Sequence, residues 1–169
     1  TINNSLYGSS SSNSLISQTD SVKNTSSTKN SSASLDEIYG VVDKYSSKYG
    51  VDRNLILAII KQESGFDKDA TSHAGARGLM QLMDMNSEYY GLTDPYDIEQ
   101  NVEAGVEHIK GYLDKYNGDL EMALMAYNGG PGTMEKRGVK DASYLYRMPT
   151  ETRNYVPAVL AHYESYKNS

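Results

Sequence analysis

The sequence predicts an all-α domain built around one buried central helix, preceded by a polar N-terminal tail. Apolar residues recur at spacings of three and four through much of residues 35–169, which is the period of an amphipathic helix. Residues 55–60, Leu-Ile-Leu-Ala-Ile-Ile, are apolar on every side, so a helix there belongs inside a core. No segment has the period-two alternation of a half-buried strand.

The first helix is predicted from its cap and its apolar spacing. Ser34 and Glu37 fit a capping box, so we expect this helix to begin at Ser34 and to end at Gly50. Asp52 fits the N-cap of the next helix, which carries the wholly apolar stretch and continues to residues 61–65.

The rest of the domain alternates helices with loops. A loop with Gly75 and Gly78 leads into an apolar turn at residues 79–83. Further helices are expected from about Ile98 to Tyr116, from the cap Asp119 to a stop at residues 128–132, and from the cap Thr150 onward, with Pro157 inside or kinking the last one. Residues 133–149 are expected to form a long loop, so the domain has six or seven helices.

The N-terminal tail differs in composition from the domain. Residues 1–34 contain 13 Ser, 5 Asn and 4 Thr, and their few apolar side chains follow no period. Such a segment buries too little apolar surface to offset the entropy of ordering it. We therefore predict a flexible, disordered Ser/Asn/Thr-rich linker over 1–34 and a domain over 35–169, the alternative being a tail that docks on the domain.

Charge and composition exclude several classes of function. The formal net charge of −6 lacks the basic face of a nucleic-acid-binding protein. The absence of cysteine excludes disulfides and thiolate chemistry, and the three histidines (His73, His108 and His162) are too far apart to indicate a His-rich metal site. No apolar run reaches the roughly 20 residues of a membrane-spanning helix, and no signal peptide is visible in this chain.

Glu63 is the principal candidate for catalysis. It lies at the C-terminal end of the most apolar helix, where the negative end of the helix dipole and desolvation both disfavour the charged carboxylate. Both effects raise its pKa, and a carboxyl that keeps its proton near neutral pH is suited to general-acid cleavage of a glycosidic bond. The alternative is a solvent-facing glutamate at a frayed helix end.

Four motifs surround this candidate in sequence order: Glu63–Phe66, Ser72–Gln81, Ala126–Gly130 and Glu151–Val156. Together they resemble the catalytic domain of the soluble lytic transglycosylases, a family related in fold to goose-type lysozyme. The resemblance covers about residues 35–166. It implies a lysozyme-like helical fold and an enzyme that cleaves the glycan strands of peptidoglycan.

The resemblance also assigns roles to individual residues. It implies that Glu63 is the single catalytic acid and base, and that the Tyr155 hydroxyl approaches its carboxylate. It implies that the substrate-binding residues of the cleft are Ser72, Gln81, Met83, Tyr127 and Asn128. One departure is Gly129, where the family usually has alanine, and we expect the neighbouring Tyr and Asn side chains to keep their places.

Several of these residues have simpler interpretations. Met80 and Met83 are also explained as core residues, and for Met80 we prefer this. Tyr127 is also explained as a buried tyrosine with a satisfied hydroxyl. Arg77 and Arg153 fit structural ion pairs and are left out of the site.

The resemblance implies a mechanism with one carboxylate, because the motifs contain no second acid in a matching role. Glu63 would cleave the β-1,4 bond between N-acetylmuramic acid and N-acetylglucosamine and leave 1,6-anhydromuramoyl ends, with no metal and no cofactor. The alternatives are a hydrolytic muramidase and a non-catalytic glycan-binding module. We expect a monomeric domain at the cell wall, outside the cytoplasm, with the further possibility of a module in a larger wall-remodelling, conjugation, secretion or phage protein.

Overall fold

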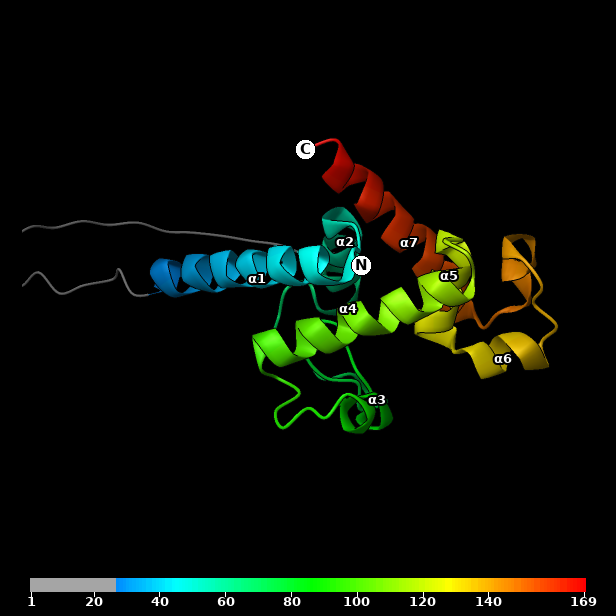
Figure 1. Cartoon of the computed structure of the whole chain (residues 1–169), viewed down its shortest axis with the longest axis horizontal. Helices are drawn as coiled ribbons and strands as arrows, with labels where there is room; N and C mark the ends of the chain where they lie inside the picture. Colours follow the sequence, from blue (N-terminus) through cyan, green and yellow to red (C-terminus); the bar gives the residue numbers. More distant parts are fainter. Residues whose placement is uncertain (1–26) are drawn as a thin grey trace, which may run out of the picture.

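The protein is all-α, as predicted (Figure 1). The structure is a computed structural model that describes residues 27–169, with side chains from residue 35 onward. This part contains seven α-helices, one 3₁₀-helix and no extended strand. The α-helices are α1 (Ser27–Tyr49), α2 (Arg53–Ser64), α3 (Asp84–Tyr89), α4 (Ile98–Lys115), α5 (Leu120–Gly129), α6 (Pro131–Lys136) and α7 (Thr150–Lys167), and the 3₁₀-helix η1 covers Ala142–Arg147.

Helix α2 is the buried centre of the domain. The side chain of Asp52 caps it by accepting a hydrogen bond from the backbone N–H of Asn54 at 2.8 Å. All six residues from Leu55 to Ile60 are buried, so this helix has no solvent-facing side along that stretch. It packs most extensively against α7 and also against α1. Gly65 ends it in the left-handed conformation that glycine adopts without strain.

Helix α4 forms a second layer, packed between α1 and α5 (Figure 1). Its apolar side carries Val102, Val106 and Ile109, all fully buried. Its N-cap, Asp97, accepts from the backbone of Gln100, and the predicted cap Asp119 accepts from Met122 at the start of α5. Among residues 27–169, no helix combines the length and apolar character needed to cross a membrane.

The first helix begins earlier than the sequence indicated. Helix α1 starts at Ser27, so Ser34 lies inside it and the predicted capping box does not mark its start. Once the helix from Leu35 onward exists, each added residue gains a backbone hydrogen bond, and weak helix formers do not stop it. The last eight residues of the predicted linker are thus helical. Residues 1–26 lie outside the described part, so the linker there stays a prediction.

Two short helices occupy a predicted loop, and a third lies in a segment for which no element was predicted. Helix α3 follows the apolar turn, and α6 and η1 occupy most of the segment expected to be a loop at residues 133–149. Pro131 starts α6 because its ring fixes a helical φ, and the buried Met134 anchors that helix. Thr150 is the first residue of α7, whose N-cap is Pro149, and the predicted threonine cap is therefore wrong. Pro157 lies inside α7, as predicted.

Candidate active site

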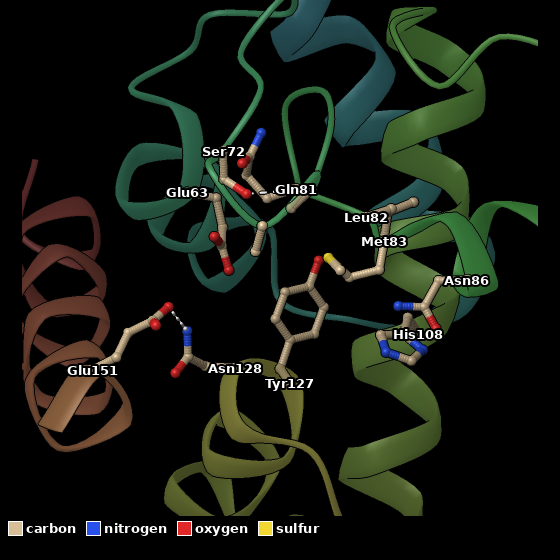
Figure 2. A pocket seen from close by; sticks show the side chains of 12 residues that line it. Glu63, Ser72, Gln81, Leu82, Met83, Asn86, His108, Tyr127, Asn128 and Glu151 are labelled. Carbon is tan, nitrogen blue, oxygen red and sulfur yellow. Dashed lines mark hydrogen bonds between the residues drawn. The ribbon is translucent and has the colours of Figure 1, made fainter. Parts of the chain in front are cut away.

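A groove lies at the C-terminal end of α2 (Figure 2). It consists of two adjoining hollows of about 330 and 490 Å³. Five residues line both hollows: Glu63, Ser72, Gln81, Asn128 and Glu151. They come from the end of α2, the loop that follows it, the end of α5 and the start of α7. Segments far apart in sequence thus meet around one carboxyl.

Glu63 occupies the boundary between the two hollows, which leaves groove on either side of it. Helix α2 is regular up to Ser64 and closed by Gly65, so the helix end is not frayed. Burial raises the pKa of the Glu63 carboxyl from 4.5 to about 7, and the negative charge of Glu151 acts in the same direction. Desolvation thus has the effect expected from the sequence.

Tyr155 lies beside this carboxyl, as the resemblance implied. Tyr155 is only 4% exposed, and its hydroxyl has no partner at standard hydrogen-bond geometry among the described residues. Its approach to Glu63 stabilises the charged carboxylate and so partly opposes the effect of burial on the pKa of that group. Burial, followed by the charge of Glu63, holds the pKa of the Tyr155 hydroxyl well above 10.

Tyr127 combines a structural and a cleft-lining position. Its hydroxyl donates a hydrogen bond of 2.7 Å to the backbone carbonyl of Met80, so the interpretation as a satisfied hydroxyl is confirmed. Its ring nevertheless lines the groove, between Glu63 and Met83 (Figure 2). Burial raises the pKa of Tyr127 well above 10, and the hydroxyl therefore stays protonated.

Asn128 is held in place by the first turn of α7. Its Nδ2 donates to Oε1 of Glu151 at 3.2 Å, and its Oδ1 accepts from the hydroxyl of Thr152 at 2.8 Å. Both ends of the amide are thus satisfied, which fixes its orientation. Thr152 is 1% exposed, so this support comes from the interior of the domain.

The loop between α2 and α3 supplies the opposite wall. Oγ of Ser72 accepts from the backbone N–H of Ala76 at 3.0 Å, which leaves its hydroxyl hydrogen available to a ligand. Nε2 of Gln81 donates to the carbonyls of Ala70 and Gly78 at 3.1 and 2.9 Å, so its Oε1 remains as the free acceptor.

Met80 and Met83, both of which could be explained as core residues, lie in different environments. Met80 is fully buried and belongs to the core, as preferred. Met83 is 41% exposed and lines the groove, so its interpretation as a core residue is wrong. It is the N-cap residue of α3 and directly precedes that helix.

Asn101 of α4 anchors this loop from behind. It is 1% exposed; its Oδ1 accepts from the N–H of Met80 at 2.8 Å, and its Nδ2 donates to the carbonyls of Arg77 and Pro95. Gly78 makes room for it: a Cβ there would lie 2.3 Å from Nδ2 of Asn101. Arg77 forms an ion pair with Asp84, as expected of a structural arginine.

Three groove residues escaped sequence reasoning. Glu151 begins the fourth motif, but no cleft role was assigned to it; it lies in the first turn of α7 and lines both hollows. His108 reaches the groove from α4, and burial lowers its pKa below 6.5. Asn86 of α3 lines the groove next to it (Figure 2). No motif contains His108 or Asn86, so the sequence carried no signal for them.

Gly129, where the family usually has alanine, has no room for a side chain, because Met148 and Thr152 occupy the space that a Cβ would take. A Cβ at this position would lie 2.5 Å from Cε of Met148 and 2.8 Å from Oγ1 of Thr152. The Tyr127 and Asn128 side chains lie in the groove, as expected. In the described part of the chain, no three histidine, aspartate or glutamate side chains cluster as metal ligands would.

Comparison with known proteins assigns the domain that contains this groove to a family. Residues 40–148 match the family described as Transglycosylase SLT domain. "Membrane-bound lytic murein transglycosylase F" of Desulfosudis oleivorans is 39% identical over 99 residues, which cover 54% of this chain and 22% of that protein. "Transglycosylase" of Enterobacteria phage PRD1 is 38% identical over 99 residues, covering 59% and 37%. The matched part of the chain spans only 22% and 37% of the length of these two relatives.

Solved structures share the fold. The inactive Glu-to-Gln mutant of the lytic transglycosylase Slt from Pseudomonas aeruginosa matches with a TM-score of 0.66 and 28% identity, over 76% of this chain and 24% of that one. The 70-kDa soluble lytic transglycosylase in complex with bulgecin A matches with a TM-score of 0.67 and 25% identity, over the same shares. Since the family match covers more than half of the 169 residues, the chain belongs to the Transglycosylase SLT domain family, with its lysozyme-like all-α fold.

Proposed function

We propose that this domain is a peptidoglycan lytic transglycosylase in which Glu63 acts first as the general acid and then as the general base. The observation that carries the proposal is the position of Glu63: a desolvated carboxyl, with a pKa of about 7, at the boundary of two adjoining hollows. A glycan strand laid along the groove would have its sugars on both sides of this carboxyl. The relatives named as lytic murein transglycosylases support the same reaction.

In the first step, the protonated Glu63 transfers its proton to the oxygen of the β-1,4 bond between N-acetylmuramic acid and N-acetylglucosamine, and the bond to the muramoyl C1 breaks. The muramoyl 2-acetamido group stabilises the positive charge that develops at C1. In the second step, the Glu63 carboxylate takes the proton of the muramoyl C6 hydroxyl. The C6 oxygen bonds to C1 and closes the 1,6-anhydro ring, so the acid is regenerated and no water is consumed.

The surroundings of Glu63 support both protonation states. Burial favours the neutral acid before cleavage, and the nearby Glu151 charge adds to that preference. After the proton has left, the buried Tyr155 hydroxyl is available to donate to the new carboxylate, because it has no other partner at standard geometry in the described part. Asn128, fixed by Glu151 and Thr152, is positioned to hold a sugar next to the acid.

A second candidate is a hydrolytic muramidase, favoured by one observation: Glu151 lines the same two hollows as Glu63. In an inverting hydrolase, a second carboxylate activates the attacking water. We prefer the transglycosylase because the Glu151 carboxylate is hydrogen-bonded to Asn128, and because the relatives bear that activity in their names. A module that only binds glycan would not need a glutamate whose pKa is raised to about 7, because binding alone requires no proton transfer.

The proposed substrate places the domain outside the cytoplasm, at the cell wall. Because the chain covers a minor part of its relatives, we propose that it works as the catalytic module of a larger wall-remodelling protein, as a monomeric unit. We propose that it needs no metal and no organic cofactor, since Glu63 carries both proton transfers, and that nucleic acid is not a partner.

Product analysis on purified sacculi tests this function. Mass spectrometry of the released fragments should find muramoyl ends lighter by one water than the hydrated ends of a hydrolase. The Glu63→Gln variant, which keeps the shape of the side chain but has no proton to donate, should release nothing. Hydrated ends alone would favour the muramidase, and substantial release by Glu63→Gln would remove Glu63 from the reaction.

A further inference from the structure

The seven methionines of the chain differ sharply in exposure. Five are buried, with at most 6% of each residue exposed: Met80, Met122, Met125, Met134 and Met148. Met83 is 41% exposed and Met85 is 76% exposed, and they stand two positions apart at the start of α3. A reagent dissolved in water therefore reaches two sulfur atoms of the folded domain and not the other five.

Met83 is the exposed methionine that lines the groove at Glu63. It contributes to the same hollow as Glu63 and Tyr127, whereas Met85 lines neither of the two hollows that Glu63 borders. Leu82 lines that hollow too but is only 1% exposed, so Met83 is the large aliphatic side chain that a ligand meets there. Figure 2 shows the Met83 side chain reaching from the start of α3 toward the ring of Tyr127. A change of polarity at its sulfur thus changes the groove wall.

The side chain of Met83 takes no part in holding α3 together. As the N-cap residue, it makes no side-chain cap hydrogen bond. Its backbone carbonyl accepts from the N–H groups of Asn86 and Ser87 at 2.9 and 3.0 Å, and these bonds do not involve the sulfur. Chemistry at the sulfur therefore alters the groove wall without removing a contact that starts the helix.

Methionine sulfur reacts with peroxides, and the reaction can be reversed. With no cysteine in the chain, the thioethers are its only sulfur groups. The sulfur attacks one oxygen of hydrogen peroxide; the O–O bond breaks, the sulfur is oxidised to the sulfoxide, and the peroxide is reduced to water. The product is polar, and methionine sulfoxide reductases convert it back. A flexible apolar side chain thus becomes one with a strong hydrogen-bond acceptor.

We infer that Met83 is an oxidative modification site at which hydrogen peroxide, by forming the sulfoxide, lowers the rate of glycan cleavage at Glu63. The sulfoxide oxygen is hydrated while the groove contains water, and a bound glycan removes that water from it, which weakens binding. The inference rests on the proposed function, which also places the domain outside the reducing cytoplasm. Oxidation of Met83 then acts as a reversible brake on cleavage of the wall.

The test treats the wild type and two matched variants with hydrogen peroxide and compares each protein with its own untreated sample. Met83→Leu removes the sulfur in the groove, and Met85→Leu removes the more exposed sulfur outside it. Leucine has nearly the volume of methionine, so both variants should fold. Peptide mass spectrometry gives the oxidised fraction of each methionine, and release of fragments from purified sacculi gives kcat/KM.

We expect Met85 and Met83 to be oxidised while the five buried methionines remain thioethers. The kcat/KM of the wild type and of Met85→Leu should fall on the order of tenfold, in proportion to oxidation of Met83, because one desolvated polar group has about that effect on binding. Treated Met83→Leu should keep the kcat/KM of its untreated sample. The two methionine sulfoxide reductases, one for each epimer, should together restore the activity of the treated wild type.

Three outcomes would overturn this inference. They are complete oxidation of Met83 with unchanged kcat/KM, an equal relative loss of activity in treated Met83→Leu, and oxidation of the buried methionines as fast as that of Met83. Failure of the proposed function is distinguishable, because it appears as an absence of cleavage by the untreated wild type. Binding of peptide-free glycan strands to the full chain carrying Glu63→Gln, with and without peroxide, then gives the effect of the sulfoxide independently of turnover.

Discussion

Replacing Glu63 with glutamine should stabilise the domain at alkaline pH and leave its stability unchanged at acid pH. Burial raises the pKa of the Glu63 carboxyl from 4.5 to about 7. A carboxyl whose pKa is higher in the folded state contributes its full stability below the unfolded pKa, and the contribution is lost as pH rises through the folded pKa. Above about pH 7, the wild type therefore carries the cost of a desolvated charge, which glutamine avoids.

The magnitude follows from the two pKa values. At about 1.4 kcal/mol per pH unit, the difference between 4.5 and about 7 corresponds to roughly 3.5 kcal/mol in the free energy of unfolding. Because the carboxyl borders an open groove, solvent screening reduces this, and we expect about 2 kcal/mol. For a domain of this size, that is about 4–8 °C in Tm.

The assay is reversible unfolding of the wild type and Glu63→Gln from about pH 4 to about pH 8.5, by heat and by urea. The difference in the free energy of unfolding should grow across the interval from 4.5 to about 7 and level off above it. Glu37→Gln, at an exposed position on α1, controls for the loss of one negative charge. A difference between Glu63→Gln and wild type that is constant with pH would refute the reasoning.

Three further predictions concern the support of the site. Glu151→Gln removes a charge that raises the pKa of the Glu63 carboxyl, so, if Glu63 is the proposed acid, the alkaline limb of the kcat/KM profile should move to lower pH. Thr152→Val leaves Oδ1 of Asn128 without its donor, and kcat/KM should fall about tenfold while circular dichroism stays unchanged. Gly78→Ala should destabilise the domain by roughly 3 kcal/mol, because the φ of Gly78 is +80° and the new Cβ would lie 2.5 Å from the backbone carbonyl oxygen of Pro95. The control Gly75→Ala also has a positive φ but makes no such contact, and it should cost about 1 kcal/mol.

Each of these has a result that contradicts it. An unchanged alkaline limb in Glu151→Gln would show that the charge of Glu151 does not act on the Glu63 carboxyl. Full activity in Thr152→Val would mean that Asn128 needs no fixed orientation. Equal losses of stability for alanine at positions 78 and 75 would mean that the contacts behind the loop do not matter.

The sequence predicted the long helices because each has enough turns to repeat its apolar pattern. The central helix was identified from six consecutive apolar residues, Leu55 to Ile60, and all six are buried. Helices α3 and α6 have six residues each, too few for a period to be recognised, and α1 extends into Ser/Asn-rich sequence that lacks apolar spacing.

In the candidate site, too, some features could be predicted from the sequence and others could not. Glu63 was identified from local sequence: it stands at the end of the most apolar helix and opens the first of the four motifs. The support of Asn128 by Glu151 and Thr152 joins residues more than twenty positions apart, and Asn101 reaches the backbone of Met80 from α4. Such contacts depend on how helices pack, and neither spacing nor composition reports them.

The central claim is that the sugar's own C6 hydroxyl, and not water, attacks the muramoyl C1 after Glu63 has given up its proton. Digestion of purified sacculi in heavy-oxygen water tests this most directly, with mass spectrometry of every newly formed muramoyl end. If the C6 hydroxyl attacks, every new end is a 1,6-anhydro end that carries no solvent oxygen. New ends that each contain one heavy oxygen atom would contradict it and identify a hydrolase.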